Sequence, residues 1–299
     1  MSLLVVGSIA YDTIETPTTK VEDSLGGSAL YFSAAASLFS PVNVVGVVGS
    51  DFDASKISFL KKRGANLDGL YMESGKTFRW GGRYFDDMNR RETLFTYLNV
   101  FERFQPVIPE HYKKSEFVFL ANIDPELQLD VLNQINNPKL IVLDTMNFWI
   151  SGKRKELEEV LKVVDIIVLN DEEAKELTGE MGLIKATKAI PAMGPKSVIV
   201  KKGEHGAMLY HENEFFFVPA FPLDSVVDPT GAGDSFAGGF MGYLAKTGQI
   251  DQATLKKAMV YGSTIASFNV EDFSFNRLEN LTMKEIKERV KIFKKMTSF

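Results

Sequence analysis

The sequence predicts an α/β fold with a doubly wound, mostly parallel sheet, helices on both faces and a small β-sheet lid. Three observations lead there: short continuous apolar runs, helical segments between them, and two segments that interrupt this alternation. Short runs rich in Val and Ile are typical of strands buried on both faces of a sheet. Strands that alternate with helices require crossover connections, which give a parallel sheet.

The predicted core strands are bounded by turn residues and follow one another along most of the chain. In order they are Leu3–Val6, Val42–Val48, Phe117–Ala121, Leu140–Leu143, Ile166–Leu169 and Val198–Val200. The helices predicted between them are Ser28–Phe39, Ser55–Arg63, Gly152–Val164 and Glu172–Thr178. Gly64 and Gly179 follow two of these helices directly, as expected for residues that end a helix.

Two segments do not fit the alternation of strands and helices. Residues 13–25 are polar, and residues 77–104 are dense in aromatic and arginine side chains. The second segment predicts short antiparallel strands inserted between the α/β units. We interpret both segments as parts of a small β lid over one end of the sheet, with a surface hairpin of no functional role as the alternative. The predicted division is a core of residues 1–12, 26–76 and 105–299, and a lid of residues 13–25 and 77–104.

Composition excludes several classes of function. The net charge of −5 and the pI of about 5.4 argue against a nucleic-acid or membrane-surface partner. The chain has no cysteine and only three scattered histidines, so thiolate chemistry and zinc sites are not expected. No basic leader and no apolar stretch of about 20 residues is present, so we expect a cytoplasmic protein.

The most specific local pattern is Val227-Asp-Pro-Thr-Gly-Ala-Gly-Asp-Ser-Phe236. A helix predicted over Ser235–Leu244 would place the backbone N–H groups of the glycine-rich turn at a helix start, which favours anion binding. Asp234 beside these donors makes sense if it accepts the proton of an attacking hydroxyl in phosphoryl transfer. The alternative is that Asp234 merely caps the helix.

Other phosphate-binding patterns are not present in the sequence. There is no G-x-x-x-x-G-K-[ST] motif, which excludes a P-loop protein. Gly231 and Gly233 do not complete G-x-G-x-x-G because Phe236 occupies the third glycine position. A dinucleotide dehydrogenase is therefore disfavoured.

The segment Val227–Phe236 resembles the C-terminal signature of the ribokinase/PfkB family of sugar and nucleoside kinases. The resemblance extends over essentially the whole chain. Gly26-Gly27-Ser-Ala resembles the diglycine motif of the family, and Gly7-Ser-Ile-Ala-Tyr-Asp12 its opening strand. Asn170-Asp-Glu-Glu173 is similar to its N-x-x-E motif, and Lys202–Ala207 to its G-x-x-G-A turn.

This resemblance implies transfer of the γ-phosphate of ATP to a primary hydroxyl of a sugar or sugar-like molecule. In that reaction Asp234 is the general base, and the amides of Gly231, Ala232 and Gly233 form the anion hole. Binding of the nucleotide is assigned to Asn170, Lys201, Gly203, Gly206 and Thr230. Glu173 is assigned to Mg²⁺, through water, although Asn170 and Glu173 also fit a helix capping box. A monovalent cation near Asp228 and Thr230 is a further expectation.

The acceptor is assigned to Asp12, Gly26, Gly27, Tyr31 and Asn122. Tyr31 stands near the position where many sugar kinases have an asparagine, and Asn147 is a weaker candidate. Aromatic residues near the expected site keep a nucleoside acceptor open as an alternative. A non-catalytic sensor is a second alternative, disfavoured by the intact Asp234. A homodimer through the lid is also expected.

Overall fold

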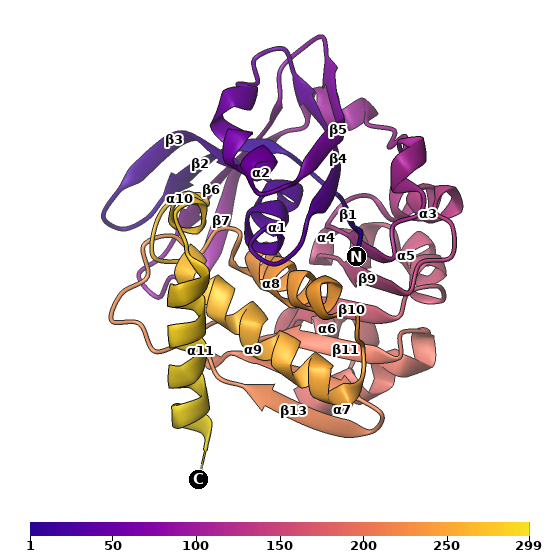
Figure 1. Cartoon of the computed structure of the whole chain (residues 1–299), viewed down its shortest axis with the longest axis vertical. Helices are drawn as coiled ribbons and strands as arrows, with labels where there is room; N and C mark the ends of the chain where they lie inside the picture. The colour runs from indigo at the N-terminus through magenta and orange to yellow at the C-terminus, as the bar shows by residue number, and fades with distance from the viewer. Residues whose placement is uncertain (299) are drawn as a thin grey trace.

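A computed structural model describes residues 1–298 and contains two sheets (Figure 1). The large sheet has nine strands in the order β13-β12-β11-β10-β9-β8-β1-β4-β5. Pairing is parallel from β11 through to β5, and only β12 and β13 run antiparallel at one edge. The predicted doubly wound, mostly parallel sheet is confirmed.

The nine strands of this sheet are β1 (Leu3–Val6), β4 (Val42–Gly49), β5 (Asn66–Glu73), β8 (Phe117–Leu120), β9 (Leu140–Asp144), β10 (Ile166–Asn170), β11 (Ser197–Lys201), β12 (Ala207–His211) and β13 (Glu214–Val218). The α-helices are α1 (Ser28–Ala36), α2 (Ser58–Lys62), α3 (Pro125–Gln134), α4 (Asn147–Gly152), α5 (Arg154–Leu161), α6 (Asp171–Thr178), α7 (Leu183–Ala189), α8 (Ala232–Thr247), α9 (Gln252–Asn269), α10 (Asn276–Glu279) and α11 (Met283–Thr297).

Both faces of the large sheet are buried, which explains the continuous apolar strands. Alternate residues of β1 enter different apolar clusters: Leu3 and Val5 pack with α1, α8 and α9, whereas Leu4 and Val6 face the cluster that includes α3, α5 and α6. Figure 1 shows α1, α8 and α9 together on one side of the sheet. No helix among residues 1–298 combines the length and the apolar character that a membrane crossing requires.

The second sheet has four strands in the order β3-β2-β6-β7, with β2 (Ala10–Glu15), β3 (Lys20–Gly26), β6 (Phe78–Tyr84) and β7 (Arg91–Tyr97). We call it the lid sheet. It takes in Ala10–Asp12 and Gly26, which the sequence division assigned to the core. Its pairing is mixed, because β2 runs parallel to β6 while both outer strands are antiparallel. The antiparallel strands predicted within residues 77–104 are confirmed by the pairing of β6 with β7.

Candidate active site

Parallel strands bring three polar residues to one edge of the large sheet. Asp144, Asn170 and Lys201 end the adjacent strands β9, β10 and β11, and Asn170 and Lys201 are register partners. Ligands of open α/β sheets bind outside the carboxyl ends of the strands. The sequence identified Asn170 and Lys201 as site residues, whereas Asp144 was recognised only as part of a weak motif.

The glycine-rich turn begins α8 and packs against Tyr31. Gly231 is the N-cap residue with a left-handed φ of 72°, and a side chain there would collide with the Tyr31 ring. Tyr31 is buried, and its ring packs directly against this turn at Gly231. Burial, followed by the charges of Asp12 and Asp228, raises the pKa of its hydroxyl.

The three amides expected to form the anion hole are not equivalent. The Ala232 N–H donates to Pro229 O at 3.2 Å and is therefore already used. Within residues 1–298, the N–H groups of Gly231 and Gly233 have no backbone acceptor. Of the three amides in the predicted anion hole, those of Gly231 and Gly233 thus keep unused donors, and the hole itself stays a prediction.

Asp234 lies in the first turn of α8, partly buried. Burial and the negative charge of Asp144 raise its pKa to about 7, although the nearby cations Lys201 and Arg91 oppose the rise. A carboxyl group with a pKa near neutrality accepts and releases protons readily at physiological pH. The N-cap residue of α8 is Gly231, so Asp234 does not occupy the capping position, and its place beside free amides fits the expected proton acceptor.

Asn170 and Glu173 form the capping box that the sequence offered as an alternative reading. Asn170 Oδ1 accepts the Glu173 N–H at 2.8 Å, and Glu173 Oε2 accepts the Asn170 N–H at 2.7 Å. Glu173 is buried, and burial raises its pKa to about 7, with Asp144 adding to the rise. The capping box holds Glu173 in the first turn of α6, next to the end of β10, and leaves its Oε1 without a role in the cap.

Asp12 belongs to the lid sheet and interacts from there with the charges of Asp228 and Asp234. It lies inside β2 and is 4% exposed, not at the mouth of β1 as the sequence suggested. Burial and the charges of Asp228 and Asp234 raise its pKa to about 8. Gly26 leaves room for this carboxylate, since a side chain there would overlap it. Gly27 is the N-cap of α1 with a φ of 93°.

The lid sheet directs further side chains to the same face as Asp12. Trp80 is the register partner of Asp12, and Tyr84 is the partner of Arg91. The Arg91 guanidinium lies 5.4 Å from the centre of the Trp80 ring, and its charge lowers the pKa of Asp12 and Asp234. Sequence reasoning named Arg91 only as one of several lid arginines, because β7 carries no pattern that marks its inner face.

Two side-chain contacts from the lid reach the turns that were assigned to the nucleotide. Thr230 Oγ1 donates to the buried Tyr84 hydroxyl at 3.1 Å. Asn89, at the tip between β6 and β7, donates to Glu204 Oε1 at 3.1 Å. Glu204 lies between Gly203 and Gly206, whose φ angles of 52° and 80° shape the turn assigned to the nucleotide. The lid therefore contacts Thr230, beside the glycine-rich turn, and the turn between Gly203 and Gly206.

Asn122 lies after β8, at the same edge of the sheet. Its Oδ1 accepts the Trp149 Nε1–H at 2.9 Å. Asn147 begins α4 and accepts the N–H of exposed Phe148 at 3.1 Å. Neither contact tests whether these asparagines bind an acceptor, and their assignment remains a prediction.

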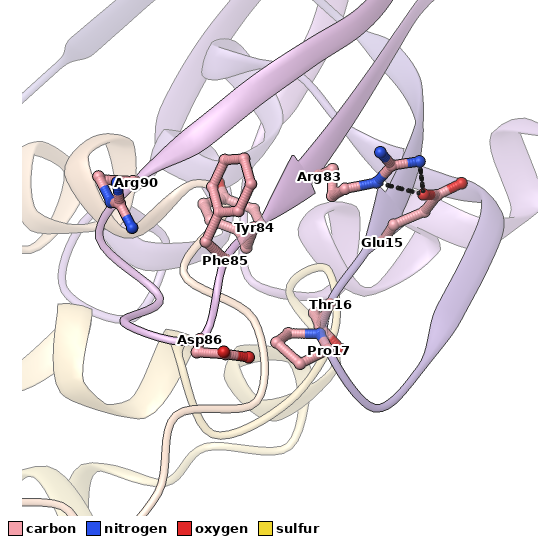
Figure 2. A pocket seen from close by; sticks show the side chains of 8 residues that line it. All are labelled: Glu15, Thr16, Pro17, Arg83, Tyr84, Phe85, Asp86 and Arg90. Carbon is pink, nitrogen blue, oxygen red and sulfur yellow. Dashed lines mark hydrogen bonds and ion pairs between the residues drawn. The ribbon is translucent and has the colours of Figure 1, made fainter.

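A pocket of about 270 Å³ opens at the ends of β2 and β6 (Figure 2). Glu15 and Arg83 form an ion pair at its rim, with a distance of 2.9 Å. Arg90 pairs with Asp87 at 2.8 Å. Both arginines are thus neutralised and exposed, and the pocket shares only Tyr84 with the cleft described above.

Comparison with known proteins decides the family. The model of the pfkB family of carbohydrate kinases matches residues 2–279. The chain belongs to this family. As a pfkB family member it is a sugar or nucleoside kinase that transfers a phosphoryl group, which confirms the resemblance seen in its motifs.

Individual relatives of this pfkB kinase act on different acceptors. A cytidine kinase of Thermococcus kodakarensis is 29% identical over 247 residues, covering 81% of this chain and 87% of the relative. The crystal structure of the Methanocaldococcus jannaschii nucleoside kinase matches with a TM-score of 0.77 and 23% identity, over 97% of this chain and 98% of that one. The structure of Arabidopsis thaliana ribokinase complexed with ribose and ATP matches with a TM-score of 0.77 and 21% identity, over 97% of this chain and 98% of that one.

Proposed function

We propose that this pfkB kinase transfers the γ-phosphoryl group of ATP to a primary hydroxyl of a sugar or sugar-bearing molecule, with Asp234 as general base. The observation that carries the proposal is the position of Asp234 in the first turn of α8, beside the free amides of Gly231 and Gly233. The acceptor oxygen forms a bond to the γ-phosphorus while the bond from that phosphorus to the bridging oxygen of ADP breaks. The hydroxyl proton passes to Asp234.

The two free amides would stabilise the negative charge on the transferred group. Fixed donors at a helix start act without reorganisation, and loss of one such donor typically costs on the order of 3 kcal/mol in the barrier. Lid contacts through Tyr84 and Asn89 would exclude water, which otherwise competes as phosphoryl acceptor. The nucleotide would lie along Asn170, Lys201, Thr230 and the turn at Gly203 and Gly206.

Mg²⁺ would bind at the edge formed by Asn170 and Glu173. No group of three Asp, Glu or His side chains suitable for a metal ion occurs within residues 1–298. This agrees with Mg²⁺ held by one carboxylate, water and the substrate phosphates. The free oxygen of Glu173 fits that role, and the ion would supply charge neutralisation of the phosphates.

A monovalent cation near Asp228 remains a prediction with mixed support. Asp228 Oδ2 is buried and has no hydrogen-bond partner within residues 1–298, which suits a cation. The carbonyl of Thr230, however, already accepts a hydrogen bond from Asn269 Nδ2 at 2.8 Å. A homodimer through the lid also remains a prediction.

The acceptor would bind between Asp12 and Asp234, where Asp12 accepts hydrogen bonds from sugar hydroxyls. Trp80, the register partner of Asp12, offers an aromatic face on the same side of the lid. That neighbour, together with the cytidine and nucleoside kinases among the relatives, favours a nucleoside as the second candidate acceptor.

A screen of acceptors with purified protein tests the proposal. Ribose, hexoses and nucleosides are each incubated with ATP and Mg²⁺, and the phosphorylated product is identified by mass spectrometry. Asp234→Asn should lower kcat at least 100-fold, on the order expected for a lost general base, and leave ATP binding unchanged. Absence of any product from the wild type, or near-normal turnover by Asp234→Asn, would contradict the proposal.

A further inference from the structure

Lys201 is a mostly buried lysine that interacts with three carboxyl groups, more than the one partner of a simple ion pair. Its ammonium lies 3.2 Å from Asp144 Oδ1, and its side chain is 20% exposed. Burial alone lowers the pKa of Lys201, but the charges of Asp144, Glu173 and Asp234 together raise it above the ordinary value. The ammonium therefore stays charged in the middle of a group of carboxylates.

The same ammonium lies directly beside the start of α8. A Cβ on Gly233 would lie 2.9 Å from Lys201 Nζ, so the missing side chain lets the lysine approach the helix backbone. Gly233 also carries one of the two amides without a backbone acceptor in the described chain. The Lys201 ammonium at the end of β11, the free Gly233 amide and the Asp234 carboxylate thus lie around one small region.

We propose that Lys201 is a catalytic residue whose ammonium, held at the start of α8, contacts the transferred phosphoryl group. This inference deepens the phosphoryl transfer proposed above and rests on it. A cation fixed where negative charge develops lowers the barrier because it needs no reorganisation during the reaction. The competing explanation is that Lys201 serves only as the structural ion-pair partner of Asp144.

The charges around Asp234 make the two explanations separable. Asp144 on β9 raises the pKa of Asp234, whereas Lys201 on β11 and Arg91 on β7 lower it. Asp12 on β2 and Tyr31 on α1 face the same carboxylate. Removal of Lys201 should therefore shift the acid limb of the pH–rate profile to higher pH, and removal of Asp144 should shift it to lower pH.

The kinetic test compares Lys201→Met, Asp144→Asn and the double variant with the wild type. Lys201→Met should lose on the order of 100-fold in kcat, change the KM for ATP only a few-fold, and move the acid limb upward. Lys201→Arg, which keeps the charge, should recover part of the rate. Equal losses in both single variants, with recovery in the double variant and no opposite shifts, would overturn the proposal in favour of a structural ion pair.

A binding measurement decides the role of Lys201 without an acceptor. ADP with aluminium fluoride and Mg²⁺ imitates the planar phosphoryl group, and calorimetry compares its affinity with that of ADP alone. Lys201→Met should weaken the aluminium fluoride complex on the order of 100-fold and ADP binding much less, because ADP lacks the transferred group. Equal affinity in both proteins would reject the role of Lys201 while the proposed kinase reaction stands. A wild type that phosphorylates no acceptor would instead reject the reaction.

Discussion

The two sheets of this kinase contribute to the cleft in different ways. The strand edge of the large sheet supplies Asp144, Asn170 and Lys201, which are held by strands buried on both faces. The lid sheet supplies Asp12 and Arg91 from one face. Its edge strands β3 and β7 are mostly exposed or half-buried.

This difference suggests that the large sheet holds the reacting phosphoryl group and that the lid sheet recognises the acceptor. Groups that must hold a reacting phosphoryl group in fixed geometry gain from a rigid, close-packed support. Groups that recognise the acceptor must admit it and then close over it, which suits a sheet whose edge strands are mostly exposed or half-buried. Loss of a large-sheet group should therefore affect kcat, and loss of a lid group should affect KM.

Asp12→Ala gives the largest effect expected from the lid. A buried polar group that loses its hydrogen-bond partner costs about 1–3 kcal/mol, so the KM of the acceptor should rise roughly 5- to 100-fold, with a smaller change in kcat. Initial rates at saturating ATP measure this. Asp23→Ala is the matched control, because the Asp23 carboxylate is 62% exposed and pairs with Arg79. A fall in kcat at unchanged KM would contradict the division between the sheets.

Most strands of the large sheet that are buried on both faces were predictable, with β12 as the exception. Strands such as β8 and β10 are continuous apolar runs, and their bounds match the predictions within one residue. β5, β12 and β13 were not predicted, since β5 and β13 mix half-buried with exposed residues and resemble loops. The helix predicted to end at Phe39 ends at Ala36, where the chain turns toward β4.

The contacts of the site were much less predictable than its motifs. The glycine-rich turn and the N-x-x-E segment are local, so their sequence patterns identify them. Lys201 and Asp144 meet across 57 residues only because β9 and β11 flank β10. Tyr84 and Thr230 are separated by 146 residues and meet only when the lid covers the turn. Such pairs follow from strand order, which local patterns do not specify.

Tyr84→Phe should have a smaller effect than Asp12→Ala. It removes the hydroxyl that accepts from Thr230 but keeps the ring, so a neutral hydrogen bond of about 1 kcal/mol is lost. Looser closure should raise ATP hydrolysis without acceptor several-fold. Release of ADP in a coupled assay measures it. Tyr97→Phe, on the exposed end of β7, is the control and should match the wild type. Identical hydrolysis in both variants would show that this contact does not couple lid and turn.

The last prediction concerns stability and compares the carboxyl groups of Asp12 and Asp234, whose charges interact. The folded pKa is about 8 for Asp12 and about 7 for Asp234, both above the unfolded value of 3.8, so the folded state binds the extra protons. This tighter proton binding adds to the free energy of unfolding. The added free energy is fully present below the unfolded pKa and is lost as the pH rises to the folded pKa.

The Tm should therefore fall between pH 5 and 8, by roughly 2 °C or more for each kcal/mol lost. Calorimetry of the wild type, Asp12→Asn and Asp234→Asn over this range measures the dependence. Each amide variant lacks one of the titrating groups and should show a flatter dependence. The flattening should extend to a higher pH in Asp12→Asn, because Asp12 has the higher folded pKa. A dependence as steep in Asp12→Asn as in the wild type would mean that the lid carboxylate does not hold its proton in the folded enzyme.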